Sequence, residues 1–134
     1  MCGVFVAHLP TLVHAAFPFL PLFVTNPVLQ ASKFDFVFID ADKRQYRAYH
    51  DFLLGSDMLT DDAVILADNV LFKGLVLNSG GRGGDKKLNY WAKRHQDIAD
   101  ELHSYNEYVI TDTRVEAVLV PLRDGLTLIR RVRK

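Results

Sequence analysis

The sequence predicts an α/β fold in which parallel strands are followed by an antiparallel hairpin. Two short runs rich in aromatic and β-branched residues, 34–39 and 63–67, are typical of buried strands in a parallel sheet. A segment with helical periodicity separates them, as a parallel connection requires. Near the C-terminus an Asp-Gly pair, residues 124–125, stands between two strand-like runs and indicates a hairpin turn.

The first predicted strand, residues 34–39, ends at the polar cluster Asp40-Ala41-Asp42-Lys43. The apolar positions that follow fall at helical spacing and are Tyr46, Tyr49, Phe52 and Leu53. We expect Gly55 to be the C-cap of this helix. Asp61 and Asp62 are predicted to form the turn before the second strand, which again ends on polar residues.

The glycine-rich segment 78–84 predicts a flexible loop, and Asp85 is a candidate N-cap for the helix after it. One stripe of that helix carries Leu88, Trp91, His95, Ile98, Leu102 and Tyr105. Residues 114–120 and 126–132 are predicted to be the two strands of the terminal hairpin. The predicted order of elements is therefore β-α-β-α-β-β.

A division of the chain is predicted at residue 33. Residues 1–32 contain no Asp, Glu, Lys or Arg and carry four of the five prolines, whereas all charged residues lie in 33–134. The prolines would interrupt a membrane-spanning helix, and the positive start of a signal peptide is absent. The segment is interpreted as a poorly ordered arm, a weak membrane-associated segment, or sequence not selected for this fold. We favour the first or third and expect little regular structure there.

The overall charge excludes no class of partner but favours neither nucleic acid nor an anionic membrane. Lys plus Arg and Asp plus Glu both total 16, so the formal net charge is zero. The single cysteine, Cys2, cannot form an internal disulfide, which is consistent with a reducing, cytoplasmic location.

Oxygen-bearing side chains follow both predicted parallel strands. Asp40 follows the first strand, and Asp68 and Asn69 follow the second. In open α/β sheets ligands bind beyond the carboxyl ends of the strands. Two carboxylates and an amide suit a hard cation such as Mg²⁺, and the cluster has no His or Cys for zinc. On spacing alone, turn formation and helix capping are the favoured alternative.

Three blocks of the sequence resemble the cation-dependent O-methyltransferases of the caffeoyl-CoA and catechol type: FDFVFIDADKRQY, VILADNVLFKGLV and RVEAVLVPLRDGLTLIRR. The resemblance covers residues 33–134 and implies the C-terminal half of a Rossmann-like methyltransferase sheet. It also implies methyl transfer from S-adenosylmethionine to a hydroxyl of a catechol-like small molecule. Mg²⁺ or another divalent cation assists that reaction.

The resemblance assigns roles to individual residues. Those matching the family's metal ligands are Asp40, Asp68 and Asn69. Lys43 matches the general base beside the acceptor hydroxyl, and Asp42 matches an acid on the cofactor side. Phe72 stands where plant members carry a substrate-facing tryptophan. For Phe72 and Tyr46, plain packing is an equal alternative.

The same resemblance implies that the cofactor-binding half is missing. Family members bind S-adenosylmethionine with a glycine-rich turn and an acidic residue, both upstream of Asp40. Before the predicted strand at 34–39, Gly3 is the only glycine, and there is no Asp or Glu. We therefore expect a truncated gene product or incomplete gene model, without measurable affinity for the cofactor and not active alone. We also expect the strand at 34–39 to have an unpaired edge and an uncovered apolar face.

Two other functions remain as alternatives. The first is a non-catalytic fragment that pairs with an intact subunit. The resemblance implies dimer formation, so a homodimer is a further expectation. The second is a relative that methylates a hydroxyl on a tRNA base, suggested by a basic end: Arg130, Arg131, Arg133 and Lys134. Zero net charge argues against RNA, so a small hydroxylated acceptor is the prediction. A membrane-tethered variant is least favoured.

Overall fold

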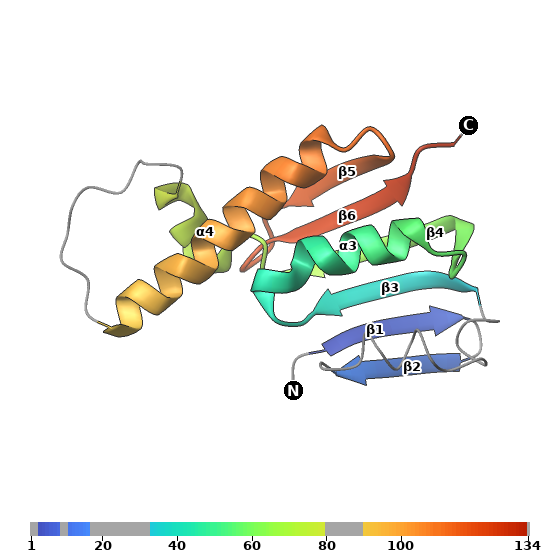
Figure 1. Ribbon diagram of the computed structural model, residues 1–134, viewed down its shortest axis with the longest axis horizontal. Coiled ribbons are helices and arrows are strands. Elements are labelled where there is room, and N and C mark those ends of the chain that lie inside the picture. Colours follow the sequence, from blue (N-terminus) through green and yellow to red (C-terminus); the bar gives the residue numbers. More distant parts are fainter. Residues whose placement is uncertain (1–2, 9–10, 17–32, 80–89, 134) are drawn as a thin grey trace.

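The computed structural model of the chain describes residues 3–8, 11–16, 33–79 and 90–133, which form one layered α/β unit (Figure 1). The strands are β1 (Gly3–His8), β2 (Thr11–Ala16), β3 (Phe34–Asp40), β4 (Leu59–Asp68), β5 (Val115–Val120) and β6 (Leu126–Arg131). The helices are α3 (Tyr46–Gly55) and α4 (Tyr90–Thr111), with 3-10 helices η1 (Lys43–Gln45) and η2 (Phe72–Asn78). All six strands form one sheet in the order β2-β1-β3-β4-β6-β5.

The centre of the sheet follows the predicted topology. β3 and β4 are parallel and in register from Phe36 beside Val64 to Ile39 beside Ala67. β6 then pairs antiparallel with β4, and β5 pairs antiparallel with β6 as a hairpin. The predicted α/β fold with a parallel start and an antiparallel end is therefore confirmed.

The prediction of a turn at Asp61 and Asp62 is wrong, because β4 begins at Leu59 and both aspartates lie within the strand. Both residues are exposed, and Asp62 forms an ion pair with Arg133. Exposed carboxylates do not prevent strand formation, since the ladder is made by backbone groups and the side chains reach solvent. Polar composition alone therefore misplaced the start of this strand.

The expectation of little regular structure in residues 1–32 is wrong for the part that the structure describes. β1 and β2 form an antiparallel hairpin, and β1 pairs antiparallel with β3, with Gly3 beside Asp40 and Ala7 beside Phe36. The edge of β3 is thus paired, contrary to expectation. The run GVFVAH carries no charge, but a strand needs only backbone donors and acceptors and side chains that suit a pleated surface. Residues 17–32 lie outside the described residues.

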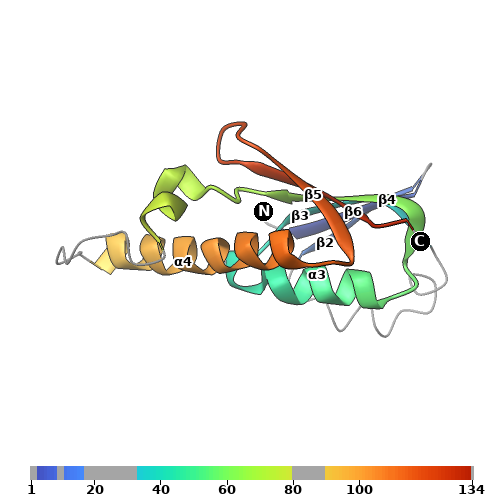
Figure 2. The same ribbon diagram turned by 90° about the horizontal axis from the view of Figure 1, so that it is seen from above.

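Both long helices pack on one face of the sheet (Figure 2). The strand side chains buried beneath them are Val37, Ile39, Ile65, Ala67 and Ile129, and those contributed by α4 are Ala99, Leu102, Tyr105 and Val109. Trp91, predicted in the buried stripe, is 64% exposed because the first turns of α4 extend beyond the sheet (Figure 1). Leu88 and Asp85 lie outside the described residues.

α3 is fixed at its C-terminal end by an arginine from β6. The guanidinium of Arg131 donates hydrogen bonds to the carbonyls of Leu53, Leu54 and Ser56, at 3.4, 2.9 and 3.0 Å. A cation at the negative end of the helix dipole stabilises these otherwise unpaired carbonyls. Gly55 is the last helical residue and Ser56 is the C-cap, so the predicted glycine cap is displaced by one residue. Neither α3 nor α4 has the length and hydropathy needed to span a membrane.

The opposite face of the sheet carries a cross-strand row of apolar side chains. Register places Val118 beside Leu128, Leu128 beside Leu66, and Leu66 beside Phe38. Val118 is 63% and Leu128 39% exposed, and no described helix covers them (Figure 2). An open apolar surface is therefore present on β5 and β6, whereas the expectation concerned β3, where Phe38 is half-buried.

Because helices cover only one face of the sheet, substitutions at two neighbouring residues of β6 should destabilise the chain to different extents. Ile129 is buried under the helices, so Ile129→Ala should lower the free energy of unfolding by about 2–5 kcal/mol. Leu128 faces the open side, and Leu128→Ala should cost less than about 1 kcal/mol. Urea denaturation followed by circular dichroism measures both. Equal losses would contradict the assignment of the two faces.

Candidate functional site

The carboxyl ends of β3 and β4 meet at one edge of the sheet. Ile39 and Ala67 are register partners, so the next residues, Asp40 and Asp68, leave the two strands at the same level. Adjacent strands lie about 4.8 Å apart, which brings two half-buried carboxylates onto neighbouring strand ends. The predicted pairing of these two residues rests on this register.

A buried tyrosine at the start of α3 joins the two strand ends. The hydroxyl of Tyr46 lies 3.2 Å from the carbonyl oxygen of Ile39 and 2.9 Å from that of Asp68, so its hydrogen is shared between two acceptors. Burial raises the pKa of Tyr46 far above its ordinary value, and the charges of Asp40 and Asp68 raise it further. The hydroxyl therefore stays protonated and acts as a donor, with both carboxylates near it.

Lys43 and Asp40 form a direct ion pair within this site. The ammonium of Lys43 donates to Oδ1 of Asp40 at 2.8 Å, and its side chain is only 11% exposed. The same nitrogen lies 5.2 Å from the ring centroid of Tyr46. The predicted base and one predicted metal ligand are therefore in contact.

Asp68 is held by the residue that follows it. Its Oδ1 accepts a hydrogen bond from the backbone N–H of Asn69 at 2.7 Å. Asn69 has a φ of 60°, in the left-handed region that asparagine tolerates better than most residues. This conformation turns the chain sharply at the end of β4 and keeps Asp68 and Asn69 at the edge of the sheet.

The loop after β4 is clamped between the terminal hairpin and α4. The backbone N–H groups of Val70 and Leu71 donate to the carbonyls of Gly125 and Asp124, at 3.2 and 2.8 Å. The side-chain amide of Asn106 on α4 donates to the carbonyl of Val70 at 2.9 Å. Every polar backbone group of the buried Val70 is thereby paired, so the loop that carries Asp68 is fixed from two sides.

Asp42 and Phe72, the other predicted site residues, have different surroundings. The carboxylate of Asp42 accepts hydrogen bonds from the side chain of Arg44, at 3.0 and 2.7 Å, and these lower its pKa. Phe72 is half-buried with a φ of 39°, and its ring centroid lies 6.0 Å from that of His95 in an edge-to-face contact. No hydrogen bond or ion pair given by the described residues joins Asp42 or Phe72 to Asp40 or Asp68.

The donor set at the strand ends consists of two carboxylates and one amide. Among the described residues, no group of three or more His, Cys, Asp or Glu side chains is arranged so that it could hold a metal ion. Oxygen donors without nitrogen or sulfur suit Mg²⁺ or Mn²⁺ better than zinc. The donors of Asp40, Asp68 and Asn69 therefore fit a hard divalent cation.

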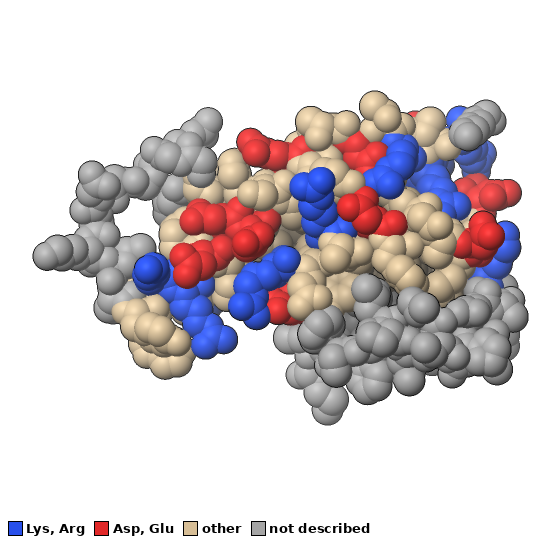
Figure 3. All heavy atoms as spheres, viewed as in Figure 1, with Lys and Arg blue, Asp and Glu red and all other residues tan. Residues whose placement is uncertain are grey.

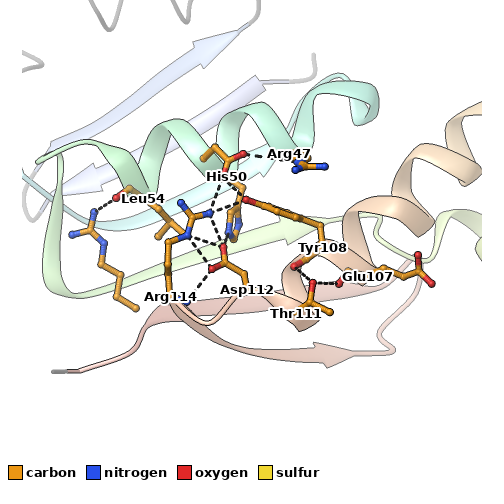
Figure 4. Close-up of polar contacts among 10 residues, drawn as sticks. Arg47, His50, Leu54, Glu107, Tyr108, Thr111, Asp112 and Arg114 are labelled. Atoms are coloured by element: carbon orange, nitrogen blue, oxygen red, sulfur yellow. Dashed lines mark hydrogen bonds and ion pairs between the residues drawn. The ribbon is translucent and has the colours of Figure 1, made fainter.

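A second polar cluster joins α3, the end of α4 and the start of β5 (Figure 4). Nε2 of His50 lies 3.0 Å from Asp112, whose carboxylate also pairs with Arg114 at 2.7 Å. Arg114 reaches Asp51 at 2.7 Å and the hydroxyl of Tyr108 at 2.8 Å. His50 has no solvent exposure, so its contact with Asp112 joins α3 to the end of α4 and does not present the imidazole to a substrate.

The sequence left plain packing as an equal alternative for Tyr46 and indicated no role for Asn106 or for the His50 cluster. From the sequence, a tyrosine that only packs in the core cannot be distinguished from one whose hydroxyl bonds to two strands, because both occupy an apolar position of the helix. The signal for Tyr46 was its place in the first turn after the cluster at 40–43. Asn106 gave no signal, because its partner Val70 is far away in the sequence.

The profile of the O-methyltransferase family matches residues 14–132, which includes part of the segment before Lys33. Tricin synthase 2 from Oryza sativa subsp. japonica is 37% identical over 118 residues, covering 88% of this chain and 37% of that protein. A caffeoyl-CoA O-methyltransferase from Zinnia elegans is 36% identical over 119 residues, covering 86% of this chain and 44% of that protein. The chain thus spans less than half the length of these relatives.

Solved structures share the fold. The SAH-bound methyltransferase of Podospora anserina has a TM-score of 0.66 and 28% identity, covering 80% of this chain and 46% of its own. A putative O-methyltransferase from Klebsiella pneumoniae has a TM-score of 0.61 and 21% identity, covering 87% of this chain and 47% of its own, and this likeness shows the fold alone. The predicted partial Rossmann-like methyltransferase sheet is confirmed.

Because the terminal hairpin packs closely on the loop after β4, adding one methyl group at Gly125 should lower the stability of the chain. Gly125 has a φ of +85°, and a Cβ there would lie 2.6 Å from Cγ of Leu71, so Gly125→Ala should destabilise the chain by about 1–3 kcal/mol. Gly55→Ala is the matched control, since a Cβ at this helical position meets nothing within 4 Å and should be neutral or stabilising by up to about 1 kcal/mol. Chemical denaturation compares them. Equal effects would contradict the clamp.

The His50 cluster predicts that stability falls as the pH is lowered from neutrality. Burial lowers the pKa of His50 below 6.5, so the unfolded chain takes up this proton first and stability declines below about pH 6.5. Hydrogen bonds from Arg114 hold the pKa of Asp112 far below 3.8, which adds a second loss below about pH 3.8.

Urea denaturation across pH 3–8 measures this dependence. His50→Gln should remove the decline near pH 6.5 while keeping the acid decline, and Asp112→Asn should reduce the acid decline. A stability that rises as the pH falls from 7 to 5 would show that His50 is not held neutral.

Proposed function

The chain belongs to the O-methyltransferase family, and we propose that it carries the metal- and acceptor-binding part of an S-adenosylmethionine-dependent O-methyltransferase. The proposed reaction transfers a methyl group to a hydroxyl of a small, catechol-like molecule. The observation that carries the proposal is the register of β3 and β4, which brings Asp40 and Asp68 to adjacent strand ends with Lys43 in contact. The names of the relatives, a caffeoyl-CoA O-methyltransferase among them, support a small hydroxylated acceptor.

Asp40, Asp68 and Asn69 would hold the divalent cation, with Mg²⁺ as the first choice. When bound, such a cation supplies Lewis acidity that favours loss of the proton from an acceptor hydroxyl. The protein contributes rigid placement of the oxygen donors through the hydroxyl of Tyr46 and the turn at Asn69. Fixed donors reduce the ordering that binding would otherwise require.

Lys43 is the proposed general base. Its ammonium pairs with Asp40 at 2.8 Å. To accept a hydroxyl proton at Nζ, Lys43 must be a neutral amine. A neutral amine does not form an ion pair with Asp40. The proton state of Lys43 and the freedom of Asp40 to bind a cation are therefore linked.

Asp42 and Phe72 have proposed roles on the cofactor side and the acceptor side. Asp42 is the proposed contact on the cofactor side, although Arg44 now holds its carboxylate. The described residues contain no glycine-rich strand-to-helix turn. The absence of measurable cofactor affinity in the isolated chain stays a prediction. Phe72 is the proposed acceptor-side wall, supported by its half-buried ring on the same loop as Asn69.

A non-catalytic subunit is the second candidate function, and the open apolar face of β5 and β6 favours it. Val118 and Leu128 on this face are exposed, and surfaces of this kind are common at interfaces between chains. The partner would be an intact methyltransferase subunit or a second copy of this chain, as a homodimer. A cytoplasmic location is proposed from the single cysteine.

Ion pairing of the basic C-terminal strand argues against a tRNA substrate. Arg130 pairs with Glu116 at 2.8 Å, Arg133 pairs with Asp62, and Arg131 binds the end of α3. On the face that carries α3 and α4, acidic and basic side chains are interspersed (Figure 3). A protein that binds RNA through phosphates usually presents a concentrated basic surface.

The metal proposal predicts that substituting Asp68, but not Asp61, weakens metal binding, although both aspartates lie on β4. Mn²⁺ should bind the purified chain, and Asp68→Asn should weaken binding at least about tenfold because a charged ligand is lost. Asp61→Asn is the matched control, since Asp61 is exposed near the other end of the same strand. Titration calorimetry with MnCl₂ measures both. Absence of binding by the wild-type chain, or equal loss in both variants, would refute the site.

A further inference from the structure

We propose that Tyr46 is a positioning residue that sets the spacing between the two proposed metal-binding carboxylates. The inference rests on the proposed function of Asp40 and Asp68. It goes beyond that function by assigning the site's geometry to a side chain that would not touch the cation.

The hydrogen bonds of Tyr46 lie just where the strand ladder ends. Ile39 and Ala67 are the last register partners of β3 and β4. One acceptor of the Tyr46 hydroxyl is the carbonyl of Ile39, directly before Asp40, and the other is the carbonyl of Asp68 itself. The hydroxyl therefore acts as a cross-link between the strands at the point where their own pairing stops.

Local structure leaves Tyr46 little freedom to move. Asp42 caps η1 by accepting from the N–H of Arg44, and the chain then turns back so that Tyr46 begins α3 beneath the strand ends. Tyr46 is fully buried, and its ring packs edge-on against Tyr105 with centroids 5.5 Å apart. A rigid ring holds its hydroxyl in place, so the separation of the strand ends depends on this contact.

Tyr105 provides a matched comparison within the same aromatic cluster. It is 2% exposed, and its buried hydroxyl has no hydrogen-bond partner in the described structure. Tyr105→Phe and Tyr46→Phe therefore each remove one buried oxygen from touching rings. Only the second removes a link to the ends of β3 and β4.

Binding of Mn²⁺ to the full chain tests the inference, with electron paramagnetic resonance used to count free Mn²⁺. Tyr46→Phe should weaken Mn²⁺ affinity about tenfold, the lower end of the range for residues that orient metal ligands. Tyr105→Phe should change it by less than about twofold. Thermal melts of both variants establish that each is folded at the temperature of the titration, so that a difference in affinity does not reflect unfolding.

A second measurement on the wild-type chain covers the case in which Tyr46→Phe does not fold. With ¹³C at the ζ carbon of tyrosine, the Tyr46 signal should shift during an Mg²⁺ titration, since its acceptors are at the site. The Tyr105 signal should shift much less. The five tyrosines are few enough to assign by single Phe variants, and a variant that does not fold is assigned by elimination.

The outcomes separate the inference from the function on which it rests. Unchanged Mn²⁺ affinity in a folded Tyr46→Phe variant, with the loss in Asp68→Asn retained, would overturn the role of Tyr46 and leave the metal site standing. An unmoved Tyr46 signal on saturation with Mg²⁺ would do the same. A wild-type chain that binds neither ion would overturn both.

Discussion

The parallel pairing of β3 with β4 is the constraint on which the rest of the structure depends. A parallel ladder aligns the ends of its strands, so one register decides which side chains meet at the edge of the sheet. Here that register brings Asp40 level with Asp68. The connection between the strands must cross over the sheet, which places α3 on the same face as α4 and gives the core one covered side.

α3 is held at both ends by groups that also serve the sheet. At its start, Tyr46 ties the strand ends together, and at its finish Arg131 from β6 binds the last carbonyls. The His50 cluster adds a third attachment, to α4 and β5. These contacts pair polar groups of the helix with partners on β6, α4 and β5, and together they favour a single arrangement of the helix. The ends of β3 and β4, which carry Asp40 and Asp68, are therefore bonded to a helix that contributes no proposed ligand.

Much of the fold after Lys33 could be predicted, because apolar runs at strand and helix periods report burial directly. The cores of β3 and β4 and the terminal hairpin were found this way, as was the burial of Leu102. β1 and β2 were missed because their pairing is made by backbone groups, which composition does not reveal. Of the candidate site, the strand-end aspartates followed from pattern and from family resemblance, and their roles stay predictions. The contact of Lys43 with Asp40 and the bonds of Tyr46 depend on distances that no sequence period encodes.

The pairing of β4 with β6 has a consequence for the order in which the chain folds. The hairpin β5–β6 and the unit β3-α3-β4 join residues close in sequence, whereas β4 and β6 are separated by η2, α4 and β5. Closing a long stretch of chain costs more entropy than closing a short one, so this docking step is expected late. The clamp of Gly125 and Asp124 on Val70 and Leu71 forms only in that step. Pulsed hydrogen exchange should therefore find the amides of Val70 and Leu71 protected after those of the β5–β6 hairpin, so that the loop after β4 is ordered late.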